Sequence, residues 1–407
     1  MFFFIYTLAF ILSTSITYRF WKRLTYNTLI NIPIFIIISL YQLFGSSFKF
    51  KELNGDVYLY LSIFVIFGSL IEILTVFGLR NIYNNSLPQR SAPVVPGIFS
   101  FFVIILSSAI LFFASLYSKH YGIISEEFEA KMASGFVGHA LVFLMITPPF
   151  IYLSYANKKI NKWTFMFCLI LVFSCLFLKQ VKSWIMIPTV FLFLTYLYYN
   201  NVNKKKFIFY ASLASFLLFT FFFLVYFFKT TIVNPDANSI ELLGQIYQHF
   251  LFYLFSGVGA FSEYLNSNVS TDTSHWYVLI LPLVNIINFI AGDPMESAIN
   301  PLNFVINYDI TNGSNVFTMF GTLWIYLNYL SFFFYGIIVF LQAFLYLNRS
   351  NYILCNVFWL ITSFGMFSWF EYYYFHLASY EAPIYVFILS VLFSGSKSGK
   401  QLRNNYS

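Results

Sequence analysis

Most of this chain consists of long apolar runs separated by short polar loops. Each run is continuously apolar and does not alternate apolar with polar residues, which favours membrane-spanning helices over the strands of a barrel. The pattern therefore predicts an all-α polytopic membrane protein. We expect about eleven spans, at Phe2–Thr17, Leu29–Phe44, Tyr58–Leu79, Gly97–Tyr117, Phe136–Tyr155, Trp163–Leu178, Trp184–Tyr199, Phe207–Phe228, Leu323–Leu347, Tyr352–Phe370 and Pro383–Phe393.

The composition of the chain supports this class. Of 407 residues, 59% are hydrophobic, 23% are aromatic and only 9% are charged, which excludes an ordinary soluble domain. Basic loops held in the cytoplasm explain the net charge of +7, so we do not expect nucleic acid as a partner. The three cysteines fall inside predicted spans, and the sequence has no nucleotide-binding or zinc-protease motif. We therefore expect no metal and no cofactor.

The charges of the loops alternate along the chain and predict its orientation. One set of loops contains most of the lysines and arginines and no acid, and the opposite set contains every acid except Glu72. The positive-inside rule makes the first set cytoplasmic, so the amino terminus lies outside and the carboxyl terminus inside. The first apolar run is expected to be a retained span and not a cleaved signal. The cytoplasmic loops are those at 19–23, 80–90, 158–162, 204–206, 349 and 397–403.

The orientation divides the chain into three regions. Residues 1–228 form an amino-terminal bundle of about eight spans, 229–320 a large external loop, and 321–407 the last spans and a cytoplasmic tail. The external loop has no lysine or arginine after Lys229. Because a short turn would join two spans equally well, a loop of this length predicts that the chemistry of the protein lies here.

Helical periodicity marks residues 240–255 within the external loop. Glu241 and His249 fall on one polar stripe, which either lines a substrate groove or faces water while the helix lies at the lipid headgroups. We expect this helix to end at Ser256–Gly259, because two close glycines favour a turn, and Glu263 to follow on a short helix. The stretch Trp276–Ala291 either crosses the membrane or forms a re-entrant or external helix.

Outer lysines and aromatic residues, together with one acid inside a span, carry further candidate chemistry. Lys179 and Lys182 lie in a tight external hairpin, where they bind either ordinary lipid headgroups or pyrophosphates. Lys119 and Lys131 flank three acids in another external loop, which is a mixed cluster or a solvated surface. The outer tyrosines and tryptophans suit either sugar stacking or an interfacial belt. Glu72 is expected to be paired, protonated or close to cytoplasmic water.

These features together resemble the O-antigen polymerases, which are oligosaccharide repeat unit polymerases of bacterial surface polysaccharides. The resemblance covers the order of the spans, the basic hairpin at Lys179–Trp184 and the late external loop. Its short motifs are Asn315-Val316-Phe317-Thr318 before a span and Ser256-Gly257-Val258-Gly259 within the loop.

The resemblance implies a GT-C-like fold related to the O-antigen ligases, in the bacterial inner membrane with a periplasmic active face. Such an enzyme transfers a glycan from undecaprenyl pyrophosphate to the sugar of an incoming undecaprenyl-pyrophosphate-linked repeat unit, without a metal. Its expected partners are these lipid-linked oligosaccharides, membrane lipids and a chain-length regulator protein.

The resemblance also implies roles for particular residues. A carboxylate or imidazole must take the proton of the attacking hydroxyl, and cations must stabilise the departing diphosphate. All six arginines are expected to be cytoplasmic, whereas the family commonly has external ones. Either lysines replace these arginines, without their bidentate geometry, or one of the arginine-containing loops lies on the other side of the membrane. The candidate proton acceptors are Glu241, His249, Glu263 and His275, the candidate pyrophosphate ligands are Lys179, Lys182, Lys119 and Lys131, and the motif residues are Asn315 and Thr318.

Three other functions stay open. A flippase for the lipid-linked unit would need polar residues at mid-bilayer along several spans, where Glu72 stands nearly alone. A membrane acyltransferase that modifies the glycan would need a His or a Ser/Asp site near the surface. A scaffold would leave the long external loop without a purpose.

Overall fold

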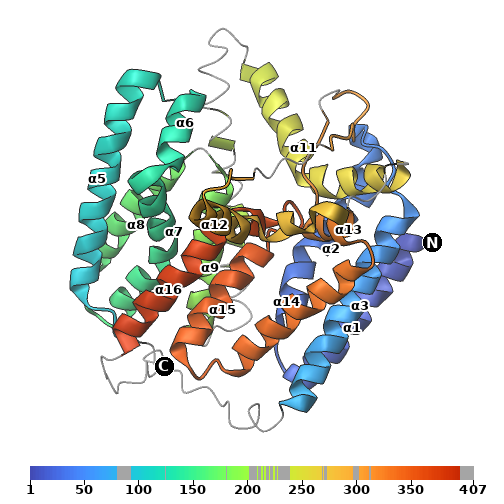
Figure 1. Cartoon of the computed structure of the whole chain (residues 1–407), viewed down its shortest axis with the longest axis horizontal. Helices are drawn as coiled ribbons and strands as arrows, with labels where there is room; N and C mark the ends of the chain where they lie inside the picture. The colour runs from blue at the N-terminus through green and yellow to red at the C-terminus, as the bar shows by residue number, and fades with distance from the viewer. Residues whose placement is uncertain are drawn as a thin grey trace. The chain divides into compact units, whose positions relative to one another are not determined.

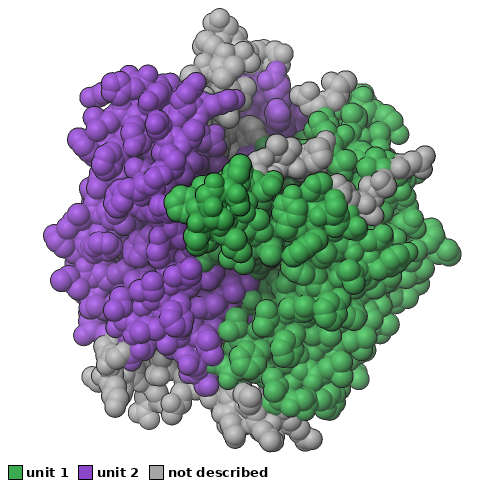
Figure 2. All heavy atoms as spheres, viewed as in Figure 1, with its two compact units in different colours: residues 1–87, 251–349, 364–380 green, residues 88–250, 350–363, 381–407 purple. Residues whose placement is uncertain are grey.

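The structure is a computed structural model, and helices make up its named elements (Figure 1). It describes residues 1–79, 93–123, 125–179, 181–200, 239–267, 269, 273–296, 302–310 and 313–394, together with scattered positions between 209 and 227. The contacts divide the chain into two compact units, each assembled from separate stretches of sequence (Figure 2). Unit 1 contains residues 1–87, 251–349 and 364–380, and unit 2 contains residues 88–250, 350–363 and 381–407.

Unit 1 is built on three long apolar helices, α1 (Phe2–Trp21), α2 (Tyr26–Phe44) and α3 (Gly55–Gly78). Both α1 and α14 (Leu330–Leu347) pack against α3. Its core is aromatic, and the ring centroids of Phe64, Phe320 and Tyr335 lie 4.6 to 5.4 Å apart. The other elements of unit 1 are η1 (Ser46–Phe48), the end of α11 (Ser239–Asn266), η2 (Thr273–Ile280), α12 (Leu281–Ala291), α13 (Met319–Leu327) and η3 (Tyr373–Phe375).

Unit 2 is arranged around α7 (Gly135–Ala156), most of whose side chains are buried. The helices α5 (Gly97–Tyr121), α6 (Glu126–Ala133), α8 (Lys162–Phe177) and α9 (Ser183–Tyr199) all pack against α7. The beginning of α11, most of α15 (Tyr352–Gly365) and most of α16 (Ala378–Ser394) complete the unit. A helix that is apolar on all sides, as α7 is, is expected at such a central position.

Seven helices among the described residues are long and apolar enough to cross a membrane. Four shorter apolar helices accompany them, at Lys162–Phe177, Ser183–Tyr199, Tyr352–Gly365 and Ala378–Ser394. These helices confirm the expected class, a helical membrane protein. The seven are Phe2–Trp21, Tyr26–Phe44, Gly55–Gly78, Gly97–Tyr121, Gly135–Ala156, Thr273–Ala291 and Leu330–Leu347.

The structure corrects two of the expected boundaries. The expected single span Leu323–Leu347 is wrong, because α13 ends at Leu327 and α14 begins at Leu330. Asn328 separates the two helices with a φ of 50°, which lies outside the helical region. The ambiguous stretch at Trp276 lies in η2 and α12, which together are long and apolar enough to span. The expected span Phe207–Phe228 lies largely outside the described residues.

The expected end of a helix at Ser256–Gly259 is also wrong, since α11 continues through these residues to Asn266. The glycines serve close packing. A Cβ atom on Gly257 would lie 2.5 Å from the carbonyl oxygen of Trp369 and 3.0 Å from that of Phe370. A Cβ atom on Gly259 would lie 3.2 Å from the side chain of Ile306. The absence of side chains therefore lets the backbone at Trp369 and the side chain of Ile306 approach α11 closely.

Glu72, the one acid expected inside a span, is buried and accepts a hydrogen bond. Its Oε1 atom accepts a hydrogen bond of 2.9 Å from the backbone N–H of Asn27, in the first turn of α2. The side chain of Asn27 in turn donates to the backbone oxygen of Val65 and to Ser69 Oγ, and accepts from the hydroxyl of Tyr335. Glu72 thus completes the polar start of α2, where the N–H groups have no partner within the helix.

Candidate functional site

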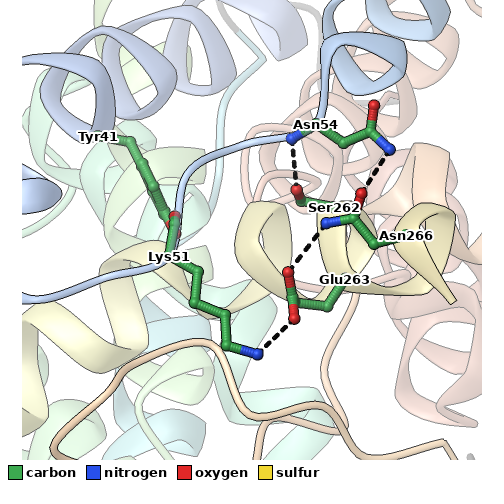
Figure 3. A network of polar contacts seen from close by, with 6 residues as sticks. All are labelled: Tyr41, Lys51, Asn54, Ser262, Glu263 and Asn266. Atoms are coloured by element: carbon green, nitrogen blue, oxygen red, sulfur yellow. Dashed lines mark hydrogen bonds and ion pairs between the residues drawn. The ribbon is translucent and has the colours of Figure 1, made fainter.

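A polar cluster lies at one end of unit 1, where the connection between α2 and α3 meets the last turns of α11 (Figure 3). The Lys51 Nζ atom lies 2.6 Å from Glu263 Oε2. We call this group the Lys51–Glu263 cluster; its members are Tyr41, Lys51, Asn54, Ser262, Glu263 and Asn266. Glu263 is one of the candidate proton acceptors, and the structure joins it to a lysine that is 212 residues away in sequence.

Hydrogen bonds hold the cluster in place. The backbone N–H of Asn54 donates to Ser262 Oγ at 2.7 Å, and the Asn54 side-chain amide donates to Asn266 Oδ1 at 2.7 Å. Asn266 Nδ2 donates to Glu263 Oε1 at 3.1 Å, so both carboxylate oxygens of Glu263 have a partner. Ser262, Glu263 and Asn266 lie within one turn and a half of α11, which brings them to one side of the helix.

The segment that carries Lys51 is fixed by residues 302–310. The N–H of Lys51 donates to the carbonyl oxygen of Ile306 at 3.0 Å, and the hydroxyl of Tyr41 donates to the carbonyl oxygen of Lys51 at 2.8 Å. Nearby, the Lys49 Nζ atom lies 2.8 Å from Asp309 Oδ2. The connection between α2 and α3 therefore packs on residues 302–310, which makes this end of unit 1 an ordered surface and not a loose loop.

A cavity of about 310 Å³ opens beside Lys51. A volume of this order fits a group the size of a monosaccharide, at the lower end of the range for ligand sites. The hydroxyl of Tyr58 donates to Gln42 Oε1 at 2.7 Å on its wall, so the lining combines rings, an amide and charged groups. The lining residues are Met1, Phe2, Phe3, Tyr41, Gln42, Ser46, Phe50, Lys51, Glu52, Leu53, Gly55 and Tyr58.

The charges of the Lys51–Glu263 cluster favour ligands with hydroxyl groups. The Glu263 side chain is 16% exposed and that of Lys51 is 30% exposed, so the pair is partly shielded from water. The cluster thus offers an ammonium donor, a carboxylate acceptor and two amides side by side, which can each hydrogen-bond a hydroxyl.

The other candidate proton acceptors do not join this cluster. His275 lies in η2, where its Nδ1 atom is 3.3 Å from Ser274 Oγ and its ring packs against Tyr277. His249 belongs to unit 2. Glu241 lies in α11, and its side chain is outside the described residues.

The candidate pyrophosphate ligands gather at one end of unit 2. Lys119 lies exposed in the last turn of α5, and Lys131 lies exposed on α6, which follows α5 directly. Lys179 and Lys182 lie between α8 and α9. The Lys179 side chain is buried, and its Nζ atom lies next to the backbone of α6. We call Lys119, Lys131, Lys179, Lys182 and His249 the basic end of unit 2.

Two members of the basic end, Lys179 and His249, have lowered pKa values. Burial lowers the pKa of the Lys179 ammonium, although the nearby Glu129 carboxylate opposes the shift. The Lys179 Nζ atom lies 3.5 Å from the backbone oxygen of Glu129. Partial burial, followed by the positive charge of Lys182, lowers the pKa of His249. A lowered pKa keeps this imidazole neutral near pH 7, the form that accepts a proton.

The two motif residues differ in their environments. Thr318 is buried and caps α13, its Oγ1 atom accepting a hydrogen bond of 3.0 Å from the N–H of Gly321. Its own N–H donates to the carbonyl oxygen of Gly257. Thr318 therefore has a structural role that explains its place in the motif. Asn315 is exposed on the segment before α13. Within the described ranges, no three His, Cys, Asp or Glu side chains gather as a metal site.

The fold and these sites define a helical membrane protein with polar, ion-paired surfaces at the ends of its helices. The chain belongs to DUF6337, a family of unknown function whose model matches residues 94–399. The matched range contains Glu263 and most of unit 2, whereas Lys51 and the helices α1 to α3 precede it. No curated protein and no solved structure matches the chain.

Proposed function

We propose that this protein is a membrane glycosyltransferase that lengthens a lipid-linked glycan, as the O-antigen polymerases do. In the reaction, a hydroxyl of the acceptor sugar forms a bond to the anomeric carbon of the donor glycan. The bond between that carbon and the undecaprenyl diphosphate breaks, and its electron pair leaves with the diphosphate. The hydroxyl proton passes to a side chain of the protein.

The Lys51–Glu263 cluster and its cavity carry this proposal. The cavity of about 310 Å³ is lined by the ammonium group of Lys51, the amide of Gln42 and aromatic rings, and the Lys51–Glu263 ion pair lies at its edge. Such a lining suits a sugar better than an apolar molecule or an ion, because a sugar presents hydroxyl groups in several directions. We assign glycan binding to this cluster. The carboxylate of Glu263 already has Lys51 and Asn266 as partners, so we assign it to hydrogen bonding and not to proton transfer.

The basic end of unit 2 supports the other half of the proposal, recognition of the lipid diphosphate. Lys182 offers a cation for a departing diphosphate, and the N–H of the neighbouring neutral His249 ring can donate a hydrogen bond to it. The proposal includes about eleven spans, a GT-C-like fold and a periplasmic position for both sites. A chain-length regulator remains an expected partner.

Deletion of the gene tests the proposed reaction directly. We expect surface polysaccharide of the deletion strain to keep single repeat units and to lose the ladder of longer chains in gel electrophoresis. Loss of all repeat units would instead point to a flippase. Unchanged chain length with one missing acyl group would point to an acyltransferase. Either result would overturn the proposal.

A point variant connects the reaction to the Lys51–Glu263 cluster. In the deletion strain, a Glu263→Ala variant should restore the ladder poorly, since it loses the partner of both Lys51 and Asn266. The control is Asp293→Ala, at an exposed acid of the same unit, which should restore the full ladder when both proteins accumulate equally in membranes. Full restoration by Glu263→Ala would remove the cluster from the function.

A further inference from the structure

A histidine and a carboxylate face each other near the starts of two helices of unit 2. His139 Nδ1 lies 2.5 Å from Glu381 Oε1, with His139 in the second turn of α7 and Glu381 in the first turn of α16. The same carboxylate oxygen accepts a hydrogen bond of 2.8 Å from the hydroxyl of Tyr385. We call these three residues the His139 triad. His139 and Glu381 are 242 residues apart in the sequence.

Successive contacts show that α7 and α16 run side by side in the same direction. One turn beyond His139 and Glu381, the rings of Phe143 and Tyr385 meet edge to face at 5.6 Å. Farther along both helices, Phe150 meets Phe393 at 6.0 Å. The apolar contacts hold the two helices together along their length, so the helix pairing does not depend on the polar pair at its end. An exposed ion pair of this kind adds little stability.

The contact with Glu381 selects one tautomer of the neutral imidazole. An ionised carboxylate can only accept a hydrogen bond, so the contact places the ring hydrogen on Nδ1. In the neutral ring, Nε2 then carries the lone pair and can take a proton, as in carboxylate-oriented histidines that act as general bases. The His139 side chain is 55% exposed while that of Glu381 is 16% exposed, which leaves the imidazole open to a ligand and its partner shielded.

The His139 triad lies at the same end of unit 2 as the candidate pyrophosphate ligands. The helix α6 ends at Ala133 and α7 begins at Gly135, so His139 follows α6 closely and packs within the same group of helices. Lys179 contacts the backbone of Glu129 on that same α6. A proton acceptor and cations that suit a diphosphate therefore share one end of this unit.

We propose that His139 is the catalytic base that takes the proton of the attacking hydroxyl, with Glu381 and Tyr385 as positioning residues. The inference rests on the proposed function for its substrate, a hydroxyl group of the acceptor glycan. As the acceptor oxygen bonds to the anomeric carbon and the diphosphate departs with the electron pair of the broken bond, the hydroxyl proton moves to His139 Nε2. His139 is then an imidazolium stabilised by Glu381, and it returns the proton to water after each transfer.

The test uses the purified full-length protein and the lipid-linked oligosaccharides that a deletion strain accumulates. A His139→Asn variant keeps an N–H donor toward Glu381 but has no basic nitrogen. We expect it to lower kcat for chain lengthening by about 10²- to 10⁴-fold, the usual effect of losing a general base, with little change in KM. By contrast, a Glu263→Ala variant should mainly raise KM, because that cluster is assigned to binding.

Two more variants separate catalysis from a structural role. Added imidazole should partly restore activity to His139→Gly, which a purely structural defect would not permit. Glu381→Asp should retain more activity than Glu381→Gln, because the amide of Gln can donate to Nδ1 and move the ring hydrogen to Nε2. The matched control is His120→Gln, at another exposed histidine of unit 2, and it should leave kcat unchanged.

The outcomes distinguish the two proposals. Wild-type protein that does not lengthen the oligosaccharide contradicts the proposed function itself. Active wild type together with an unchanged kcat in His139→Asn overturns the assignment of His139 alone. If His139→Asn and His139→Gly both fail to accumulate, the comparison of Glu381→Asp with Glu381→Gln decides, and equal activity of these two variants counts against the assignment.

Discussion

At the scale of single residues, the sequence identified the chemistry of individual side chains better than their partners. Glu263 was expected to be a functional acid because it follows the glycines of the external loop, and it does lie in a polar cluster. Its partner Lys51 lies in a short connection 212 residues earlier, and no local pattern links the two. The His139–Glu381 pair was missed for the same reason, since each residue alone resembles an ordinary polar residue at a helix end.

Lys182 allows a prediction about the recognition of diphosphate. Lys182→Ala should reduce chain lengthening by about 10²-fold, the order of effect seen when a donor to developing charge is removed. Lys182→Arg keeps the charge and should retain more activity than Ala. The measurement is the length distribution of surface polysaccharide in the complemented deletion strain.

The control for this prediction is Lys162→Ala, because Lys162 starts α8 whereas Lys182 follows its end. This lysine belongs to a loop expected in the cytoplasm, so its loss should leave chain length unaltered. Wild-type chain lengths in both Lys182 variants would remove Lys182 from the mechanism.

At the scale of elements, most helices in the described residues lie where hydrophobic runs predicted them. The runs at Leu29, Gly97, Phe136 and Trp184 correspond closely to α2, α5, α7 and α9. The errors fall where packing overrides local preference. Gly257 and Gly259 predicted a turn, but α11 continues through both residues. The backbone of residues 369 and 370 lies so close to Gly257 that a side chain would not fit there. Such contacts between distant segments cannot be derived from glycine spacing.

The glycines of α11 permit a matched pair of stability measurements. Gly257→Ala places a methyl group 2.5 Å from the Trp369 carbonyl oxygen and should lower the free energy of unfolding by about 1–3 kcal/mol. Gly244→Ala, on the same helix, meets nothing within 4 Å and should raise it by up to about 1 kcal/mol through helix propensity.

Denaturant unfolding of the two variants in detergent micelles provides the comparison. Equal effects of both substitutions would show that Gly257 does not sit against a neighbouring backbone. A larger loss for Gly257→Ala would show that its hydrogen atom occupies a place that a methyl group cannot take.

At the scale of the whole molecule, composition and periodicity were sufficient for the class but not for the assembly. Each of the two units combines segments from the first and last parts of the chain, such as residues 1–87 with 251–349. The expected regions, divided at residues 228 and 320, describe the order of membrane crossings, whereas the two units describe which residues pack together. The three regions stay a prediction. Which apolar helices pair depends on side-chain fit, and a hydropathy pattern carries little information about fit.

The orientation of the protein allows a labelling test. The native cysteines Cys168, Cys175 and Cys355 are buried, so an introduced cysteine can be followed with a membrane-impermeant maleimide. Tyr308→Cys, at a side chain that is 71% exposed, should react in intact spheroplasts. Lys159→Cys, in a loop expected in the cytoplasm, should react only after lysis. The reverse pattern would place the Lys51–Glu263 cluster on the cytoplasmic side and contradict the proposed periplasmic reaction.

The hydrogen bond from Asn27 to Glu72 has a consequence for biogenesis. Because the first turn of α2 is completed by a carboxylate that arrives 45 residues later, α2 alone would enter the lipid with an unsatisfied polar end. Insertion of α2 would therefore be more favourable after α3 has been synthesised, when the two helices can enter the bilayer as a hairpin. We therefore expect α2 and α3 to enter the bilayer together, with the hydrogen bond between Asn27 and Glu72 already formed.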